Sequence, residues 1–182
     1  MNKNLKALCT SAVLIALSTV LSMIKIWQMP LGGSVTLLSM VPVCMVGMLY
    51  GFKWGAPACF LYGFIQIFLG GVFSWGLTPV VLISCIMLDY VLAYGVLSVS
   101  CILKDKGKFG ILWGVMLGCF LRFICHFVSG YVLFASFEVF NSPVLYSIVY
   151  NGAYMLPEMI ITAIGVFLLC KSRVLEKMLG IK

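Results

Sequence analysis

Residues 110–134 read GILWGVMLGCFLRFICHFVSGYVLF, and this stretch decides the class of fold. It contains no acidic residue, and its basic residues are Arg122 and His126. A run of about 20 predominantly apolar residues is long enough to cross the hydrocarbon core of a bilayer as an α-helix. The stretch therefore predicts a transmembrane helix that holds two polar side chains inside the membrane.

The same pattern recurs along the whole chain. Of its 182 residues, 63% are hydrophobic and only 9% are charged, which is too little charge for the surface of a soluble domain. Six apolar runs can be drawn, at Leu5–Met23, Val35–Tyr50, Trp54–Gly71, Pro79–Leu103, Gly110–Phe134 and Tyr146–Cys170. We expect an all-α membrane protein of six transmembrane helices, folded as a single domain over residues 1–182. The second run is short and contains Pro42, and we expect it to form a hairpin with the third around Gly51–Lys53.

The basic residues indicate how the chain lies in the membrane. They account for the net charge of +7 but sit in loops and tails between apolar runs, so we do not expect nucleic acid as a partner. Six spans would place ten of them on one side: Lys3, Lys6, Lys53, Lys104, Lys106, Lys108, Lys171, Arg173, Lys177 and Lys182. The other side would hold Lys25. Because loops rich in Lys and Arg stay in the cytoplasm, we expect both termini there, in a multi-pass protein of the cell membrane.

Some kinds of site are not predicted by this sequence. The eight cysteines form no CxxC pair, so neither a disulfide framework nor a metal site is indicated. No P-loop is present, so the chain is not expected to bind and hydrolyse ATP in the usual way. We expect no cofactor.

Ionisable residues inside the apolar runs are the first candidates for function, because a charge is expensive in hydrocarbon. Asp89, Arg122, His126 and Glu158 lie in such runs. We expect Arg122 and Glu158 to form an ion pair between the fifth and sixth helices. A lone carboxylate at Asp89 stays ionised only if a cation compensates it, and either Arg122 or a ligand with a permanent positive charge could do so.

Polar and aromatic residues gather near the predicted outer ends of the last two helices. Arg122, His126 and Gly130 recur every four residues, and Asn151 lies among the regularly spaced tyrosines of the sixth run. The small residues Gly110, Gly114 and Gly118 continue the first stripe toward the cytoplasm and predict close helix packing. The outer loops carry aromatic residues that suit either an interfacial belt or a cover over a pocket: Trp27, Trp75, Phe137 and Phe140. Together these residues favour a site for a cationic heteroaromatic molecule.

Four segments carry a resemblance to a known family. They are Met29–Thr36 (MPLGGSVT), Leu88–Tyr90 (LDY), Leu121–Gly130 (LRFICHFVSG) and Tyr146–Glu158 (YSIVYNGAYMLPE). Over nearly its whole length the chain resembles the thiamine-specific S components, the substrate-binding subunits of energy-coupling-factor transporters. The resemblance implies a six-helix protein without ATPase activity that binds thiamine from the outside with high affinity. It also implies docking onto a membrane coupling subunit and two cytoplasmic ATPases, in a Gram-positive-type bacterium.

The resemblance assigns roles to individual residues. It implies that Asp89 and Tyr90 lie beside the thiazolium of thiamine, and that His126, Tyr146 and Asn151 hold the aminopyrimidine. We expect four more residues to contribute to the site: Trp27, Gly130, Phe134 and Tyr150. Ala12 and Ala16 match the AxxxA docking pattern of the first helix. The chain departs from the family pattern in having Asp89 in place of Glu and Phe134 near a position of Trp, so both contacts are smaller.

Two alternatives remain open on the sequence. One is an S component for another vitamin, such as riboflavin, or for a pyrimidine precursor, although a neutral substrate would not need the carboxylate of Asp89. The other is an intramembrane enzyme that uses His126 with Ser129 or Asp89. No Gly-x-Ser-x-Gly-like elbow supports a nucleophile, so we expect a binding protein and not an enzyme.

Overall fold

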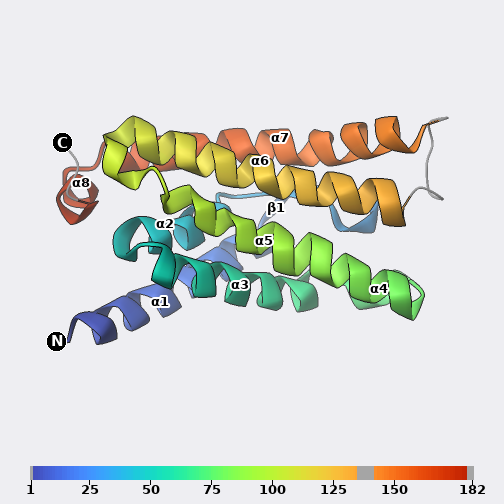
Figure 1. The fold of residues 1–182 in the computed structure, drawn as a ribbon, viewed down its shortest axis with the longest axis horizontal. Coiled ribbons are helices and arrows are strands. Elements are labelled where there is room, and N and C mark those ends of the chain that lie inside the picture. The colour runs from blue at the N-terminus through green and yellow to red at the C-terminus, as the bar shows by residue number, and fades with distance from the viewer. Residues whose placement is uncertain (1, 135–141, 180–182) are drawn as a thin grey trace.

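Each apolar run contains a helix in the computed structural model, which describes residues 2–134 and 142–179 (Figure 1). The main elements in chain order are α1 (Lys3–Met23), β1 (Lys25–Gln28), β2 (Ser34–Thr36), α2 (Met40–Tyr50), α3 (Phe52–Leu69), α4 (Pro79–Cys85), α5 (Ala93–Gly95), α6 (Gly107–Leu133), α7 (Pro143–Cys170) and α8 (Arg173–Leu179). Short 3-10 turns lie at Pro30–Gly32, Val72–Ser74 and Lys104–Lys106. A π-helical segment, η3 (Ile86–Leu92), and a 3-10 segment, η4 (Val96–Cys101), continue α4 and α5 as one span.

Among the described residues, five helical stretches are long and apolar enough to cross a membrane: Lys3–Met23, Phe52–Ser74, Pro79–Cys101, Lys104–Leu133 and Pro143–Cys170. Large apolar side chains are exposed along their outer faces, as lipid contact requires. The expectation of an all-α membrane fold is therefore confirmed. The second run differs from a full span, because α2 has only 11 residues and rises about 16 Å. Pro42 lies in its first turn, where the missing N–H costs no helical hydrogen bond.

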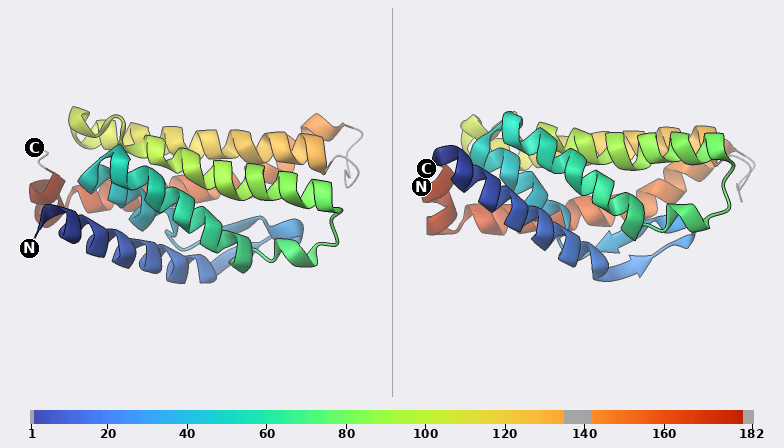
Figure 2. Two further views of the ribbon diagram at one scale, coloured as in Figure 1. Left: turned by 60° about the horizontal axis from the view of Figure 1, so that its bottom comes forward. Right: turned by 90° about the horizontal axis from the view of Figure 1, so that it is seen from below.

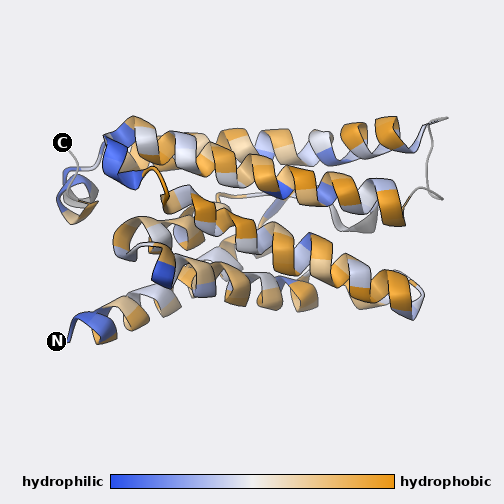
Figure 3. Ribbon diagram, viewed as in Figure 1, coloured by the Kyte–Doolittle hydropathy of each residue, from blue (hydrophilic) through white to orange (hydrophobic). Residues whose placement is uncertain are grey.

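The two ends of the bundle differ in polarity. Both termini, the turn between α2 and α3, and the start of α6 lie at the same end (Figure 1). Hydrophilic residues concentrate there, while the helices themselves are mostly apolar (Figure 3). At this end Lys108 and Glu176 form an ion pair that joins α6 to α8. Apart from Lys25 on the hairpin, the described basic residues of the loops and tails therefore share one end of the molecule, as the count of spans predicted.

Small residues allow the helices to approach closely. A Cβ atom on Gly55 of α3 would lie 2.7 Å from the Cα of Gly47 in α2. A Cβ atom on Gly114 of α6 would lie 2.3 Å from the carbonyl oxygen of Ser100 in η4. The glycine stripe of α6 is therefore a packing surface, as its spacing predicted.

The segment between α1 and α2, predicted to be an outer loop, contains regular structure, because β1 and β2 pair antiparallel as a hairpin. This hairpin lies beyond the C-terminal end of α1 and against α7 (Figure 2). Leu38, between β2 and α2, has a φ of 60°. This left-handed conformation costs a non-glycine residue about 1–2 kcal/mol, so neighbouring contacts must hold it in place.

Candidate functional site

A cavity of about 310 Å³ lies in the half of the bundle away from the termini. Its walls come from the end of α1, the hairpin, α3, η3, α6 and α7. Eight predicted site residues line it: Asp89, Tyr90, His126, Gly130, Phe134, Tyr146, Tyr150 and Asn151. The cavity is within the usual size range of small-molecule sites, about 300–1,000 Å³.

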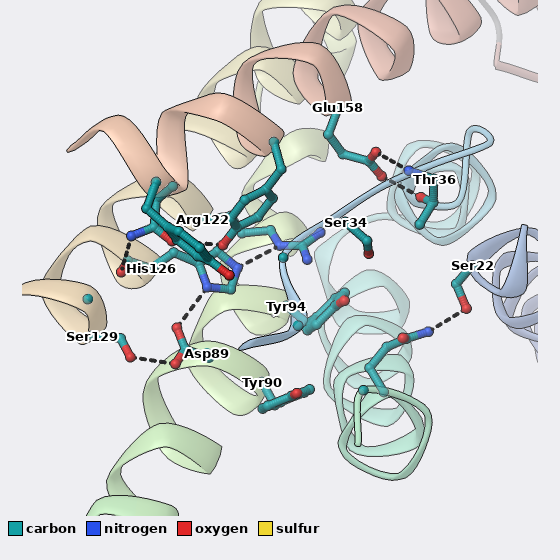
Figure 4. A pocket seen from close by; sticks show the side chains of 18 of the residues that line it. Ser22, Ser34, Thr36, Asp89, Tyr90, Tyr94, Arg122, His126, Ser129 and Glu158 are labelled. Carbon is teal, nitrogen blue, oxygen red and sulfur yellow. Dashed lines mark hydrogen bonds and ion pairs between the residues drawn. The ribbon is translucent and has the colours of Figure 1, made fainter. Parts of the chain in front are cut away.

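Asp89 projects into the cavity wall from the π-helical segment η3 (Figure 4). A π turn inserts extra backbone and shifts the side chains that follow, and such turns are frequent at functional sites. One carboxylate oxygen lies 2.7 Å from Nδ1 of His126. The other accepts hydrogen bonds from the hydroxyl of Ser129 and from the thiol of Cys85, the latter at 3.2 Å. Asp89 is thus fixed by donors from both its own span and α6.

His126 connects Asp89 to Arg122. The Nε–H of Arg122 donates to Nε2 of His126 at 3.3 Å. Arginine has no acceptor, so Nε2 must offer its lone pair and the imidazole proton lies on Nδ1. That proton is donated to Asp89. The guanidinium of Arg122 also lies 4.0 Å from the ring centre of Tyr94, a cation–π contact.

Asn151 holds α7 against α6. Its amide nitrogen donates to the backbone carbonyl of His126 at 3.1 Å, and its amide oxygen accepts from the hydroxyl of Tyr154 at 2.9 Å. Gly130 permits this approach, because a Cβ atom there would lie 2.7 Å from the Asn151 amide nitrogen. These two predicted site residues therefore set the spacing of α6 and α7 as well as lining the cavity.

Aromatic rings form another part of the wall. Trp75 meets Phe134 edge-on, with ring centres 6.4 Å apart. Tyr146 and Tyr150 stack with centres 5.6 Å apart. Tyr90 is buried and completes the wall on the η3 side. Such faces can stack on a flat heteroaromatic ligand and attract a cation.

The structure corrects two predictions. Trp27 lies on β1, whose four residues are all exposed, and it does not line the cavity; Trp75 occupies the wall instead. Arg122 and Glu158 do not form the expected ion pair. The ion pair among the described residues is Lys108–Glu176, and the contact of His126 with Asp89 is a hydrogen bond from the neutral imidazole. Glu158 bonds to the hairpin segment, and Arg122 bonds to His126, so each finds a partner elsewhere.

Several lining residues were not predicted. Gln66 of α3 donates to the hydroxyl of Ser22 at 2.8 Å, and both residues line the cavity. Thr36 and Ser39 line it beside Glu158. A single glutamine or serine in an apolar run gives little signal, although Gln66 is a buried amide and needs a partner for the same reason as Asn151.

Other predicted residues lie away from the cavity or outside the described residues. Ala12 and Ala16 are exposed on the outer face of α1, so they do not pack the interior of this chain. Phe137 and Phe140 fall in residues 135–141, outside the described part.

The comparisons with known proteins identify the family. The family described as "Thiamine transporter protein (Thia_YuaJ)" matches residues 8–177. The chain belongs to this thiamine transporter family. The thiamine transporter ThiT of Bacillus subtilis is 33% identical over 183 aligned positions, which cover 92% of each chain. A solved structure of ThiT from Listeria monocytogenes has the same fold, with a TM-score of 0.79, 24% identity, and coverage of 98% of this chain and 99% of that one.

Membership of the thiamine transporter family confirms the resemblance to thiamine-specific S components and the expectation that the chain is not an enzyme. The geometry agrees on the second point. A catalytic serine needs a hydrogen bond from its hydroxyl to the histidine base. Here the Ser129 hydroxyl donates to Asp89, while Nε2 of His126 is occupied by Arg122. The three residues are therefore not arranged as a nucleophile and its base.

Proposed function

We propose that this chain is the S component that captures thiamine with high affinity for an energy-coupling-factor transporter, and that the cavity is the thiamine site. The observation that carries the proposal is the Asp89–His126 pair in the wall of a cavity with aromatic sides. A permanent cation such as the thiazolium would complement the carboxylate of Asp89, and the aromatic faces would stack on its rings.

The two rings of thiamine are assigned to two groups of residues that meet at the hydrogen bond between His126 and Asp89. The thiazolium lies beside Asp89 and Tyr90, and the aminopyrimidine lies near His126, Tyr146 and Asn151. The assignment is supported by chemistry, because only Asp89 in this set offers a carboxylate to a cation. The hydroxyl of Tyr146 can donate to a ring nitrogen of the pyrimidine or accept from its amino group.

Transport requires a partner in this proposal. The chain has no P-loop, so the energy comes from two cytoplasmic ATPases through a membrane coupling subunit. The termini face the cytoplasm, and the cavity opens toward the outer half of the membrane. The gathering of basic loops at the end with the termini supports this orientation. The relatives from Bacillus and Listeria fit a Gram-positive-type bacterium.

Titration of the purified protein with thiamine, read by tryptophan fluorescence, tests the proposal. Thiamine should quench the fluorescence saturably, because Trp75 lines the cavity and a stacked ring quenches an indole. Riboflavin should not displace bound thiamine. Trp75→Phe should lose most of the quenching, whereas Trp27→Phe is the matched control and should retain it, because Trp27 is half-exposed on the hairpin. Saturable binding of riboflavin without any response to thiamine would refute the assignment.

A further inference from the structure

Glu158 of α7 binds the segment that joins the hairpin to α2. It is 3% exposed. One carboxylate oxygen accepts from the backbone N–H of Thr36 at 2.7 Å, and the other accepts from the Thr36 hydroxyl at 2.6 Å (Figure 4). The hydroxyl of Ser39 lies 3.4 Å from the second oxygen and 2.6 Å from the hydroxyl of Thr36. Residues 36–39, the hairpin root, are therefore held to α7 by one side chain.

The hairpin root contains a non-glycine residue with a left-handed backbone conformation. Leu38, with its φ of 60°, lies between the two residues that bond to Glu158. A non-glycine residue in this region persists only when surrounding contacts fix it. Its side chain also packs on α7, where a Cβ atom on Gly165 would lie 2.5 Å from Cδ2 of Leu38. The contacts to α7 thus fix the direction in which the hairpin leaves α2.

The hairpin in turn covers the cavity. Gly33 lies against the ring of Tyr154, and Gly32, with a φ of 92°, lies against Trp75. The hydroxyl of Tyr150 donates to the carbonyl of Pro30. These contacts join the hairpin tip to three aromatic residues of the wall, so a change in the hairpin's direction would open the wall.

We propose that Glu158 is a positioning residue that holds the hairpin over the cavity and so sets the time for which thiamine stays bound. The inference rests on the proposed function of the cavity. A ligand beneath the hairpin leaves only when the hairpin moves, and this movement breaks the bonds of Glu158 to Thr36. Glu158 acts on the ligand through the hairpin, so its effect does not depend on the charge of the ligand.

Two variants and one control separate this role from general stability. Glu158→Leu removes all its bonds to the hairpin root. Thr36→Val preserves shape and keeps the backbone bond to Glu158, but it removes the bonds of the Thr36 hydroxyl to Glu158 and Ser39. Thr162→Val is the control, because Thr162 lies one turn further along α7, is fully buried, and has a hydroxyl without a hydrogen-bond partner. Hydrogen exchange of residues 25–36 in the ligand-free protein reports on the hairpin. Stopped-flow dissociation of thiamine, and of a neutral analogue with a thiophene in place of the thiazolium, reports on residence time.

Exchange in residues 25–36 should be faster in Glu158→Leu and Thr36→Val and unchanged in Thr162→Val. Dissociation should accelerate roughly tenfold or more in Glu158→Leu and about threefold in Thr36→Val, by the same factor for both ligands. Unchanged exchange in Thr36→Val, or acceleration for thiamine alone, would overturn the proposal; the latter result would make Glu158 a direct ligand contact. Failure of the wild-type protein to bind thiamine would refute the proposed function, and the exchange comparison would still decide the role of Glu158.

Discussion

At the scale of single residues, a chain of hydrogen bonds orders the polar wall of the cavity. Arg122 donates to His126, and His126 and Ser129 donate to Asp89. Each donor has a fixed role, because arginine cannot accept and the carboxylate cannot donate. The carboxylate is therefore held in place before a ligand arrives, which lowers the cost of ordering the site on binding.

The two nitrogens of His126 should not be equally important. His126→Asn places an amide near the position of Nδ1 and can preserve the bond to Asp89, whereas His126→Gln reaches the position of Nε2 and loses that bond. We expect His126→Gln to weaken thiamine binding by about 1–3 kcal/mol, because the partly buried carboxylate of Asp89 loses a donor that holds it in place. His126→Asn should lose less. Calorimetric titration of both variants measures the difference, and equal losses would mean that the hydrogen bond from Nδ1 to Asp89 does not support binding.

At the scale of elements, the short helix α2 makes room for the site. Its rise of about 16 Å covers roughly half of a hydrocarbon core of about 30 Å. β2 precedes α2 in the chain and lines the cavity together with the ends of its neighbours. The cavity is therefore built where a full span is missing, and the longer helices around it supply its walls.

Helix packing below the cavity should tolerate little added volume. Gly114→Ala would place a methyl group 2.3 Å from the carbonyl oxygen of Ser100, which forces α6 away from η4. We expect a loss of about 1–3 kcal/mol in stability, measured as a lower melting temperature in detergent. Gly152→Ala is the matched control, because nothing lies within 4 Å of the added atom and alanine favours the helix by about 0.5–1 kcal/mol. A melting temperature that falls equally in both variants would contradict this packing account.

At the scale of the whole molecule, the surfaces proposed for capture and for coupling are separate. The cavity lies between the ends of α1, α3, η3, α6 and α7, whereas Ala12 and Ala16 face outward from the middle of α1. A flat surface of small residues in a membrane allows close approach of another helix. The proposed transporter partners would use such a surface without touching the cavity.

Ala12→Trp or Ala16→Trp should abolish thiamine uptake by cells and leave thiamine binding to the purified protein intact. An indole on this exposed face would keep a partner helix at a distance, but it would not enter the interior of the chain. Uptake of radiolabelled thiamine and titration of the same variant separate the two activities. A parallel loss of binding and uptake would place the coupling surface elsewhere.

The sequence predicted the features that depend on the preference of side chains for lipid or water and on the spacing of residues along a helix. The apolar runs, the clustering of basic loops and the glycine stripe of α6 all follow from one-dimensional patterns. Asp89, His126 and Asn151 stood out because polar groups are costly in hydrocarbon. Together with a family resemblance, these signals found eight of the 25 described residues that line the cavity, on the side formed by η3, α6 and α7.

The remaining features depend on contacts between distant segments. Glu158 was assigned to Arg122 by charge, but Thr36, 122 positions away in sequence, supplies the donors instead. The left-handed Leu38 and the π-helical turn that carries Asp89 have no local sequence pattern of their own. Trp27 and Trp75 both lie in weakly charged loops between apolar runs, so the sequence does not distinguish them. In the structure Trp27 lies on the exposed strand β1, whereas Trp75 lines the cavity.

The central claim is that the carboxylate of Asp89 compensates the charge of bound thiamine, and one comparison tests it most directly. Calorimetric titration of wild-type protein and Asp89→Asn is carried out with thiamine and with its neutral thiophene analogue. Neutralising one partner of a desolvated charge pair costs on the order of 2–5 kcal/mol. Asp89→Asn should therefore weaken the binding of thiamine by an amount in this range and the binding of the neutral analogue far less. Equal losses for the two ligands would contradict the claim and leave Asp89 as a structural partner of His126.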